Sequence, residues 1–84
     1  MRKNITEKNF MVVAEKYRQD GIMRCLKERG QVLFSVDRHT ICRAEKNEDN
    51  IVLSIQPRKG WKDDVLAMIK NNSFVNELIE NCEC

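Results

Sequence analysis

The stretch from residue 50 to residue 69 constrains the fold most, because it passes from strand to helix character within a few positions. Its first part alternates apolar and polar side chains, which is typical of a strand with one buried face. Pro57, the only proline, cannot donate to a strand ladder and is expected to end this strand. After Gly60, a helix is expected to begin at Trp61. The apolar residues behind the two assignments are Ile51, Leu53 and Ile55 in the strand and Val65, Leu66, Met68 and Ile69 in the helix.

The N-terminal part of the chain is expected to be helical. A helix is predicted over residues 5–17 with Thr6 as its cap. A second helix is predicted over residues 22–29 and should end at Gly30, although a single bent helix with Gly21 inside it would also fit. The first helix is indicated by apolar residues at the i, i+3, i+4, i+7 spacing, namely Phe10, Val13, Ala14 and Tyr17.

The middle of the chain is rich in strand-forming residues. Strands are predicted over residues 31–36 and 40–45, and with residues 51–56 they would form a three-stranded antiparallel meander. The polar run at residues 71–73 should interrupt the C-terminal helical region, with Ser73 capping a last helix. The apolar residues of that last helix are Val75, Leu78, Ile79 and Cys82.

The predicted fold class is therefore α+β, with an N-terminal helix or helix pair, a three-stranded antiparallel β-meander and one or two C-terminal helices. A chain of 84 residues forms one small domain. Its predicted parts are helical residues 1–30, the meander at 31–56 and the C-terminal helical region at 57–84. Because three strands leave exposed edges, a homodimer is expected.

Charge is divided unevenly along the chain. Residues 1–62 hold 14 Lys and Arg against 8 Asp and Glu, whereas residues 63–84 hold 1 against 5. The start of the sequence lacks the apolar run of a signal peptide, and no apolar run approaches the roughly 20 residues that cross a bilayer. We therefore expect a cytoplasmic protein without membrane contact, whose cysteines are thiols or metal ligands and not disulfides.

Cysteine and histidine residues are the candidate metal ligands. His39 and Cys42 have a spacing that suits one turn, but the sequence contains no C-x-x-C pair. Cys25 and Cys42 could equally be small buried apolar residues, so no metal and no cofactor are expected. The sequence also lacks a Gly-rich phosphate loop and a G-x-S-x-G motif, and we predict that the chain is not an enzyme. The full set of candidate ligands was Cys25, His39, Cys42, Cys82 and Cys84.

Two groups of residues are candidates for binding. Lys and Arg attract phosphates, so the basic residues could contact DNA, or they could simply form a solvated face interleaved with acids. The apolar residues of the C-terminal helices could fill a partner's groove, or they could pack on the chain's own sheet. The nucleic-acid candidates are Arg24, Lys27, Arg29, Arg38, Arg58 and Lys59, and the partner candidates are Trp61, Val65, Met68, Ile69 and Leu78.

Trp61 is the largest apolar side chain and lies where the strand passes into the helix. We expect its ring to lie against Ile51, Leu53 or Ile55 and to clamp the C-terminal helix to the sheet, because so small a chain rarely leaves its only Trp outside the core. The alternative is an exposed ring that anchors a partner.

Residues 50–82 carry the run I-V-L-S-I-Q-P-R-K-G-W followed by an acidic amphipathic helix. This stretch resembles the C-terminal part of MazE- and VapB-type (AbrB-like) antitoxins, in which the last strand of a swapped-hairpin DNA-binding domain leads into a toxin-binding tail. The resemblance implies that Trp61, Val65, Met68 and Ile69 are tail anchors. That family opens with a strand and a short I-P motif, whereas helix is predicted here, so no DNA-binding position is carried over.

The sequence thus predicts a small non-enzymatic regulatory protein, antitoxin-like, that contacts DNA through its basic body and a protein partner through its acidic C-terminal helices. The alternative is a phage-type inhibitor or adaptor that acts by protein–protein binding only. A structural zinc module is a third class.

Overall fold

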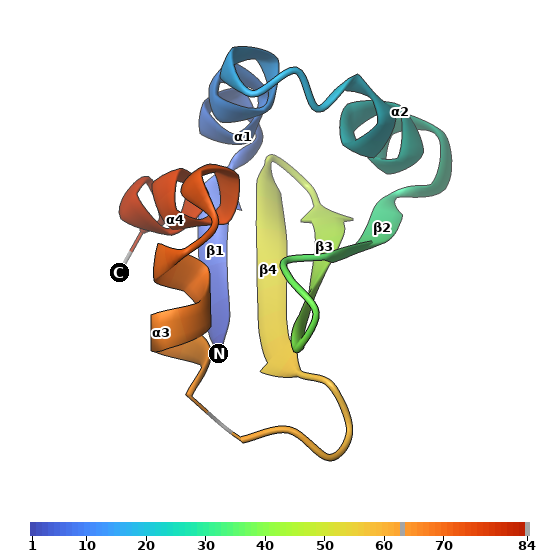
Figure 1. Cartoon of the computed structure of the whole chain (residues 1–84). Coiled ribbons are helices and arrows are strands. Elements are labelled where there is room, and N and C mark those ends of the chain that lie inside the picture. Colours follow the sequence, from blue (N-terminus) through green and yellow to red (C-terminus); the bar gives the residue numbers. More distant parts are fainter. Residues whose placement is uncertain (63, 84) are drawn as a thin grey trace.

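The computed structural model describes residues 1–62 and 64–83, and these residues form a four-stranded antiparallel sheet with four helices (Figure 1). The strands lie in the order β1-β4-β3-β2. None of the helices in the described part is both long and apolar enough to cross a membrane. The elements are β1 (Arg2–Thr6), α1 (Glu7–Lys16), α2 (Asp20–Arg29), β2 (Gln31–Ser35), β3 (Thr40–Asn47), β4 (Asn50–Pro57), α3 (Val65–Lys70) and α4 (Ser73–Glu80).

The α+β class is confirmed, and β2, β3 and β4 form the predicted meander. A further strand that the sequence pattern does not indicate, β1, pairs antiparallel with β4 and sets Ile5 opposite Ile51. Polar residues surround Ile5, so this strand has no alternating pattern of its own, and its pairing with β4 determines its conformation. The helix predicted from Ile5 begins at Glu7 instead, and the Thr6 side chain caps it by accepting from the Asn9 backbone N–H at 3.2 Å.

The boundaries of the other helices follow their caps. Two separate helices, and not one bent helix, precede the meander, and Gly30 ends α2 with a left-handed φ of 76°. The helix predicted from Trp61 begins only at Val65, because Asp64 caps it by accepting from Ala67. Asn72, and not Ser73, caps α4 by accepting from the Val75 N–H at 3.1 Å.

The helices pack on one face of the sheet and bury its apolar side chains. Ile51, Leu53 and Ile55 are fully buried, as the alternation in β4 predicts. Phe74 of α4 forms the aromatic centre of the core, with ring centroids 6.4 Å from Phe10, 5.8 Å from Tyr17 and 6.1 Å from Phe34. The other core residues include Ile5, Val13, Ala14, Leu26, Cys42, Ala44, Val65, Ile69, Val75 and Leu78.

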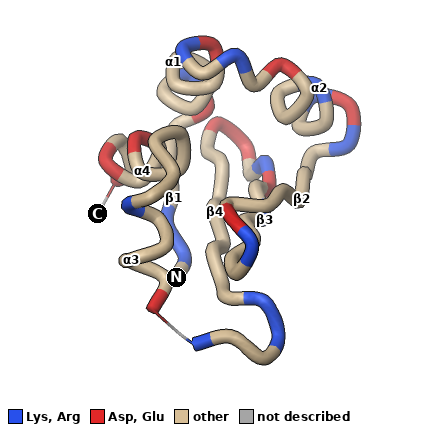
Figure 2. Tube along the Cα trace, in the orientation of Figure 1, with Lys and Arg blue, Asp and Glu red and all other residues tan. Residues whose placement is uncertain are grey.

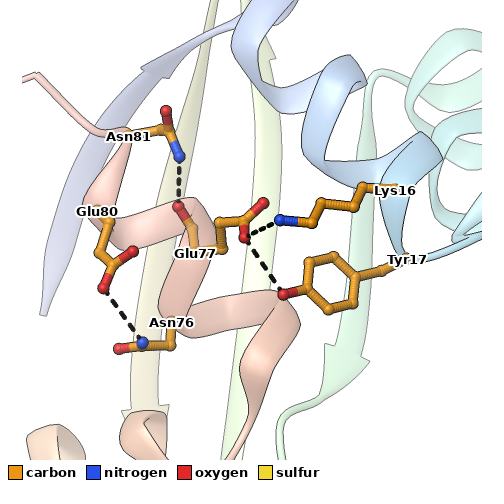
Figure 3. A network of polar contacts seen from close by, with 6 residues as sticks. All are labelled: Lys16, Tyr17, Asn76, Glu77, Glu80 and Asn81. Carbon is orange, nitrogen blue, oxygen red and sulfur yellow. Dashed lines mark hydrogen bonds and ion pairs between the residues drawn. The ribbon is translucent and has the colours of Figure 1, made fainter.

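A polar network joins α1 to α4 at the edge of this core (Figure 3). Lys16 Nζ lies 2.7 Å from Glu77 Oε1, and the Tyr17 hydroxyl donates to the same oxygen at 3.3 Å. The hydrogen bond and the charge of Glu77 raise the pKa of Lys16 above its usual 10.5. A raised lysine pKa means that the contact stabilises the fold below pH 10.5 and that this contribution is lost as pH rises through the folded-state pKa of Lys16.

Glu77→Gln is therefore expected to lower the melting temperature slightly at neutral pH and low salt. The difference from wild type should shrink at high salt, because salt screens exposed charges, and also above pH 10.5 as Lys16 loses its proton. Glu80→Gln is the matched control, since Glu80 accepts a 3.4 Å bond from Asn76 and forms no ion pair with Lys16, although its charge also raises the pKa of Lys16 as the smallest of the causes. Equal melting temperatures for the two variants under all conditions would show that the Lys16–Glu77 contact contributes nothing.

Candidate functional site

The loop that follows β4 holds Trp61 outside the core. The Arg58 N–H donates to the His39 carbonyl at 2.7 Å, and the Trp61 N–H donates to the Arg58 carbonyl at 3.1 Å, which folds the loop against the β2–β3 turn. Gly60 has a φ of 92°, a conformation that glycine adopts without strain. The loop therefore directs Trp61 toward the β2–β3 turn.

The prediction that Trp61 clamps the helix to the sheet is wrong. Its side chain is 52% exposed, and its ring lies on His39 with centroids 3.7 Å apart and planes inclined at 42°. The inner face of β4 is instead filled by residues of the helices, including Val65 and Ile69.

Beside this aromatic pair lies a cleft of about 550 Å³, here called the Trp61 cleft. Three segments form it: the β2–β3 turn, the loop after β4, and α3 with the residue that follows it. Its lining combines apolar side chains, Trp61, Ala67 and Met68, with charged ones. The complete lining is Asp37, His39, Gly60, Trp61, Lys62, Asp64, Ala67, Met68 and Asn71.

Side-chain hydrogen bonds hold the cleft in shape before anything binds. The hydroxyl of Thr40, which is fully buried, donates to the Met68 sulfur. The Asn72 amide donates to the Val36 carbonyl at 2.7 Å, so the start of α4 is tied to the end of β2. These contacts fix α3 against the β2–β3 turn, and the cleft is preformed.

His39 is the unusual group of the site. Its backbone N–H donates to Asp37 Oδ1 at 2.7 Å, which shapes the turn, but its ring Nδ1 is buried and has no hydrogen-bond partner among the described residues. Buried polar atoms nearly always have a partner. An atom without one, underneath a half-exposed Trp, marks this end of the molecule as the candidate site.

The structure divides the predicted partner residues into two sets. Trp61 and Met68 line the cleft, whereas Val65, Ile69 and Leu78 are buried in the chain's own core. The cleft also contains Asp37, Asp64 and Asn71, which were not among the residues predicted to bind a partner. The first two follow local rules, since Asp37 accepts within a turn and Asp64 caps a helix, but nothing local shows that the two segments meet.

The predicted nucleic-acid residues also fall into separate groups (Figure 2). Arg24 and Lys27 lie on the outer side of α2 beside Asp20 and Glu28. Arg29 is the last residue of α2 and lines a different hollow together with Arg43. The remaining three are on two loops that are joined by the hydrogen bond from Arg58 to His39, namely Arg38, Arg58 and Lys59.

The cysteines are dispersed. Burial raises the pKa of Cys42 to about 12, so its thiol is protonated at neutral pH, and burial also raises the pKa of Cys82. Within residues 1–62 and 64–83, no group of three or more His, Cys, Asp and Glu residues is placed to hold a metal ion. Cys84 lies outside the described residues.

Comparisons of the chain with models of protein families, with curated proteins and with solved structures gave no match.

Proposed function

We propose that this chain is a small non-enzymatic binding protein that holds a protein partner at the Trp61 cleft. The observation that carries the proposal is a 52% exposed Trp beside a preformed cleft in a chain with no other Trp. Tryptophan is strongly enriched among the residues that dominate binding energy at protein interfaces. A partner side chain that fills the cleft would cover the indole and the Met68 side chain together.

The mixed character of the lining suits a protein surface. Asp37 and Asp64 supply carboxylates and Lys62 supplies an ammonium group beside the apolar side chains of Trp61, Ala67 and Met68. Protein interfaces likewise combine apolar contacts with polar and charged ones. The antitoxin resemblance also implies a protein partner, and it includes Trp61 and Met68 among the anchors. Contact through Val65, Ile69 and Leu78 would require α3 and α4 to leave the sheet, whereas the cleft needs no such opening.

The proposal is tested by Trp61→Ala. With wild-type protein as bait in the native host, a partner is identified by mass spectrometry and purified, and its affinity is then compared for wild type and variant. A selective loss of binding supports the proposal, and unchanged binding by a folded variant refutes it.

A second candidate function is DNA binding by an antitoxin-like regulator, which one observation favours. Arg38, Arg58 and Lys59 come together on adjoining loops, and such a cluster suits phosphate contacts. The acids beside Arg24 and Lys27 make α2 a weaker phosphate-binding surface.

For this second candidate, Arg38→Ala with Lys59→Ala is expected to weaken duplex retention on all sequences and to reduce the salt slope by about 2, which is about 1 per phosphate contact. Arg24→Ala with Lys27→Ala removes the same charge from α2 and should have a smaller effect. Retention is measured on immobilised duplex across a salt series. If the wild type does not bind duplex at low salt, DNA binding is excluded.

A further inference from the structure

The edge of the sheet at β2 is open. In an antiparallel pair, every second residue forms hydrogen bonds to the neighbouring strand. The Val36 N–H donates to the Thr40 carbonyl and the Lys46 N–H donates to the Gly30 carbonyl, which shows which residues of β2 these are. In that alternation Val32 and Phe34 bond to β3. The outward-pointing N–H and C=O groups then belong to Gln31, Leu33 and Ser35, and no backbone partner for them is found among the described residues.

The opposite edge of the sheet is different. There Glu83 forms a bridge with β1, and its N–H donates to the Asn4 carbonyl at 2.8 Å. The chain thus covers part of one edge with its own C-terminal residues and leaves the other edge free.

Arginine side chains flank the open edge at both ends. Arg43 reaches from β3 across β2, and its Nη2 donates to Gln31 Oε1 at 2.7 Å. At the far end of β2, Arg58 donates to the Ser35 hydroxyl. Between these two positions, Leu33 is 65% exposed on the same face of the sheet. The outer face of β2 therefore presents a cation, an apolar side chain and a second cation in sequence.

A hollow of about 510 Å³ lies along this edge at the start of the strand. It is bordered by Cys25 and Arg29 of α2 and by Gln31, Leu33 and Arg43 of the sheet. Arg29 adds a further cation beside the open backbone groups. Arg43 also lies 3.8 Å from Glu45 Oε2 of β3, which offsets part of its charge. Because Arg29, Arg43 and Arg58 outnumber this acid, the edge keeps a positive balance.

We propose that β2 accepts an extended acidic segment of a partner protein as a fifth strand of the sheet. Gln31 and Ser35 are four residues apart, which is about 13 Å in a strand. The matching segment carries acidic residues at positions i and i+4 and an apolar residue at i+2. Main-chain hydrogen bonds to the edge would supply affinity and the two carboxylates would supply specificity. This surface is separate from the Trp61 cleft, and the inference does not depend on the proposed function.

Charge argues against the other occupants of this edge. In an antiparallel pair of two β2 strands centred on Leu33, Gln31 of one copy would face Ser35 of the other. Arg43 would then meet the second copy's counterpart of Arg58, and like charges across a strand pair are destabilising. The phosphates of a nucleic acid could bind the arginine side chains. A nucleic acid has no peptide backbone, however, and so cannot pair as a strand with the open N–H and C=O groups of β2.

The test uses the full chain, labelled with ¹⁵N, and the peptide acetyl-Thr-Glu-Thr-Val-Thr-Glu-Thr-amide. The peptide sequence reads the same in both directions, so it fits a parallel or an antiparallel arrangement. Millimolar peptide is expected to shift the amide resonances of Gln31, Leu33 and Ser35 first. Replacing both Glu residues of the peptide by Gln should weaken binding about tenfold, because two exposed charge pairs are lost, and replacement by Lys should abolish it.

Two variants of the protein separate backbone pairing from side-chain contact. Leu33→Ala removes the apolar side chain, whereas Leu33→Pro also removes the outward N–H, which takes no part in the ladder with β3. Peptide binding should survive the first change, weakened a few-fold, and should be lost in the second, while the spectra of both free variants keep the pattern of the folded chain.

Four results would overturn the proposal. These are no shift in the wild type at millimolar peptide, shifts confined to the loop around Trp61, concentration-dependent shifts at β2 without peptide, and larger shifts at β2 with a DNA duplex than with the peptide. The third would identify a second copy as the occupant, and the fourth would identify nucleic acid.

Discussion

Trp61→Ala is expected to weaken partner binding by at least about 30-fold while lowering the free energy of unfolding by only about 2 kcal/mol. The large effect follows from the contact that the ring offers. Truncation of an anchor at the centre of an interface costs about 2 kcal/mol or more, and each 1.4 kcal/mol is about tenfold in affinity. The effect on stability is smaller than for a core aromatic residue, since the ring contacts His39 and leaves 52% of the residue's surface in solvent.

Leu66→Ala is the matched control, because Leu66 is 63% exposed on α3 and is not part of the cleft lining. The control should keep both its melting temperature and its affinity for the partner. The single Trp also allows a direct measurement. Its emission should be red-shifted and readily quenched in the free protein, and it should shift to the blue when the partner binds. A loss of about 3–5 kcal/mol in Trp61→Ala, the cost of removing a core aromatic ring, would show that Trp61 clamps the helix to the sheet and would remove the basis of the proposed site.

Phe74→Ala is expected to cost about 3–5 kcal/mol of the free energy of unfolding, the usual range for removing a buried aromatic ring. Phe74 is 6% exposed and packs against three other rings, from α1, β2 and the residue after α1. Small domains often have only about 5 kcal/mol of stability in total. The variant should therefore be largely unfolded or very close to its unfolding midpoint at room temperature.

Circular dichroism during urea titration measures this change. Val12→Ala on α1 is the control, because its side chain is 59% exposed and lies away from the ring cluster. It should differ from wild type by no more than about 0.5 kcal/mol. A Phe74→Ala variant that unfolds at the same urea concentration as this control would contradict the packing of α4 on the sheet.

The parts of the fold that depend on residues close together in the sequence could be predicted from it. Gly30 ends a helix because glycine adopts positive φ freely, and Thr6 caps a helix because its side chain accepts from an N–H three residues ahead. The buried face of β4 follows from a period of two. The strand β1 could not be predicted in this way, since its conformation depends on pairing with a segment distant in sequence.

The difference between local signals and contacts between distant segments also explains why the candidate site could not be predicted in full. The buried position predicted for Trp61 rests on its size and on its place between a strand and a helix, with the assumption that the core needs the largest side chain. Phe74 and the apolar residues of α3 and α4 fill that core without it. The partner of the ring, His39, comes from a turn whose approach to the loop after β4 depends on the β3–β4 register and on the hydrogen bond from Arg58. No local pattern in the sequence reports such an approach.

The pairing of β1 with β4 also determines when β1 can join the sheet during synthesis of the chain. Among the described strands β1 is synthesised first, whereas β4, the strand with which it pairs, follows after α1, α2, β2 and β3. The two hairpins β2–β3 and β3–β4 are local and can close as soon as their residues emerge, whereas contacts between distant segments form slowly. The nascent chain therefore carries Ile5 without its pairing partner Ile51 until synthesis has passed β4. During that interval the side chain of Ile5, which is fully buried in the folded chain, stays exposed to solvent.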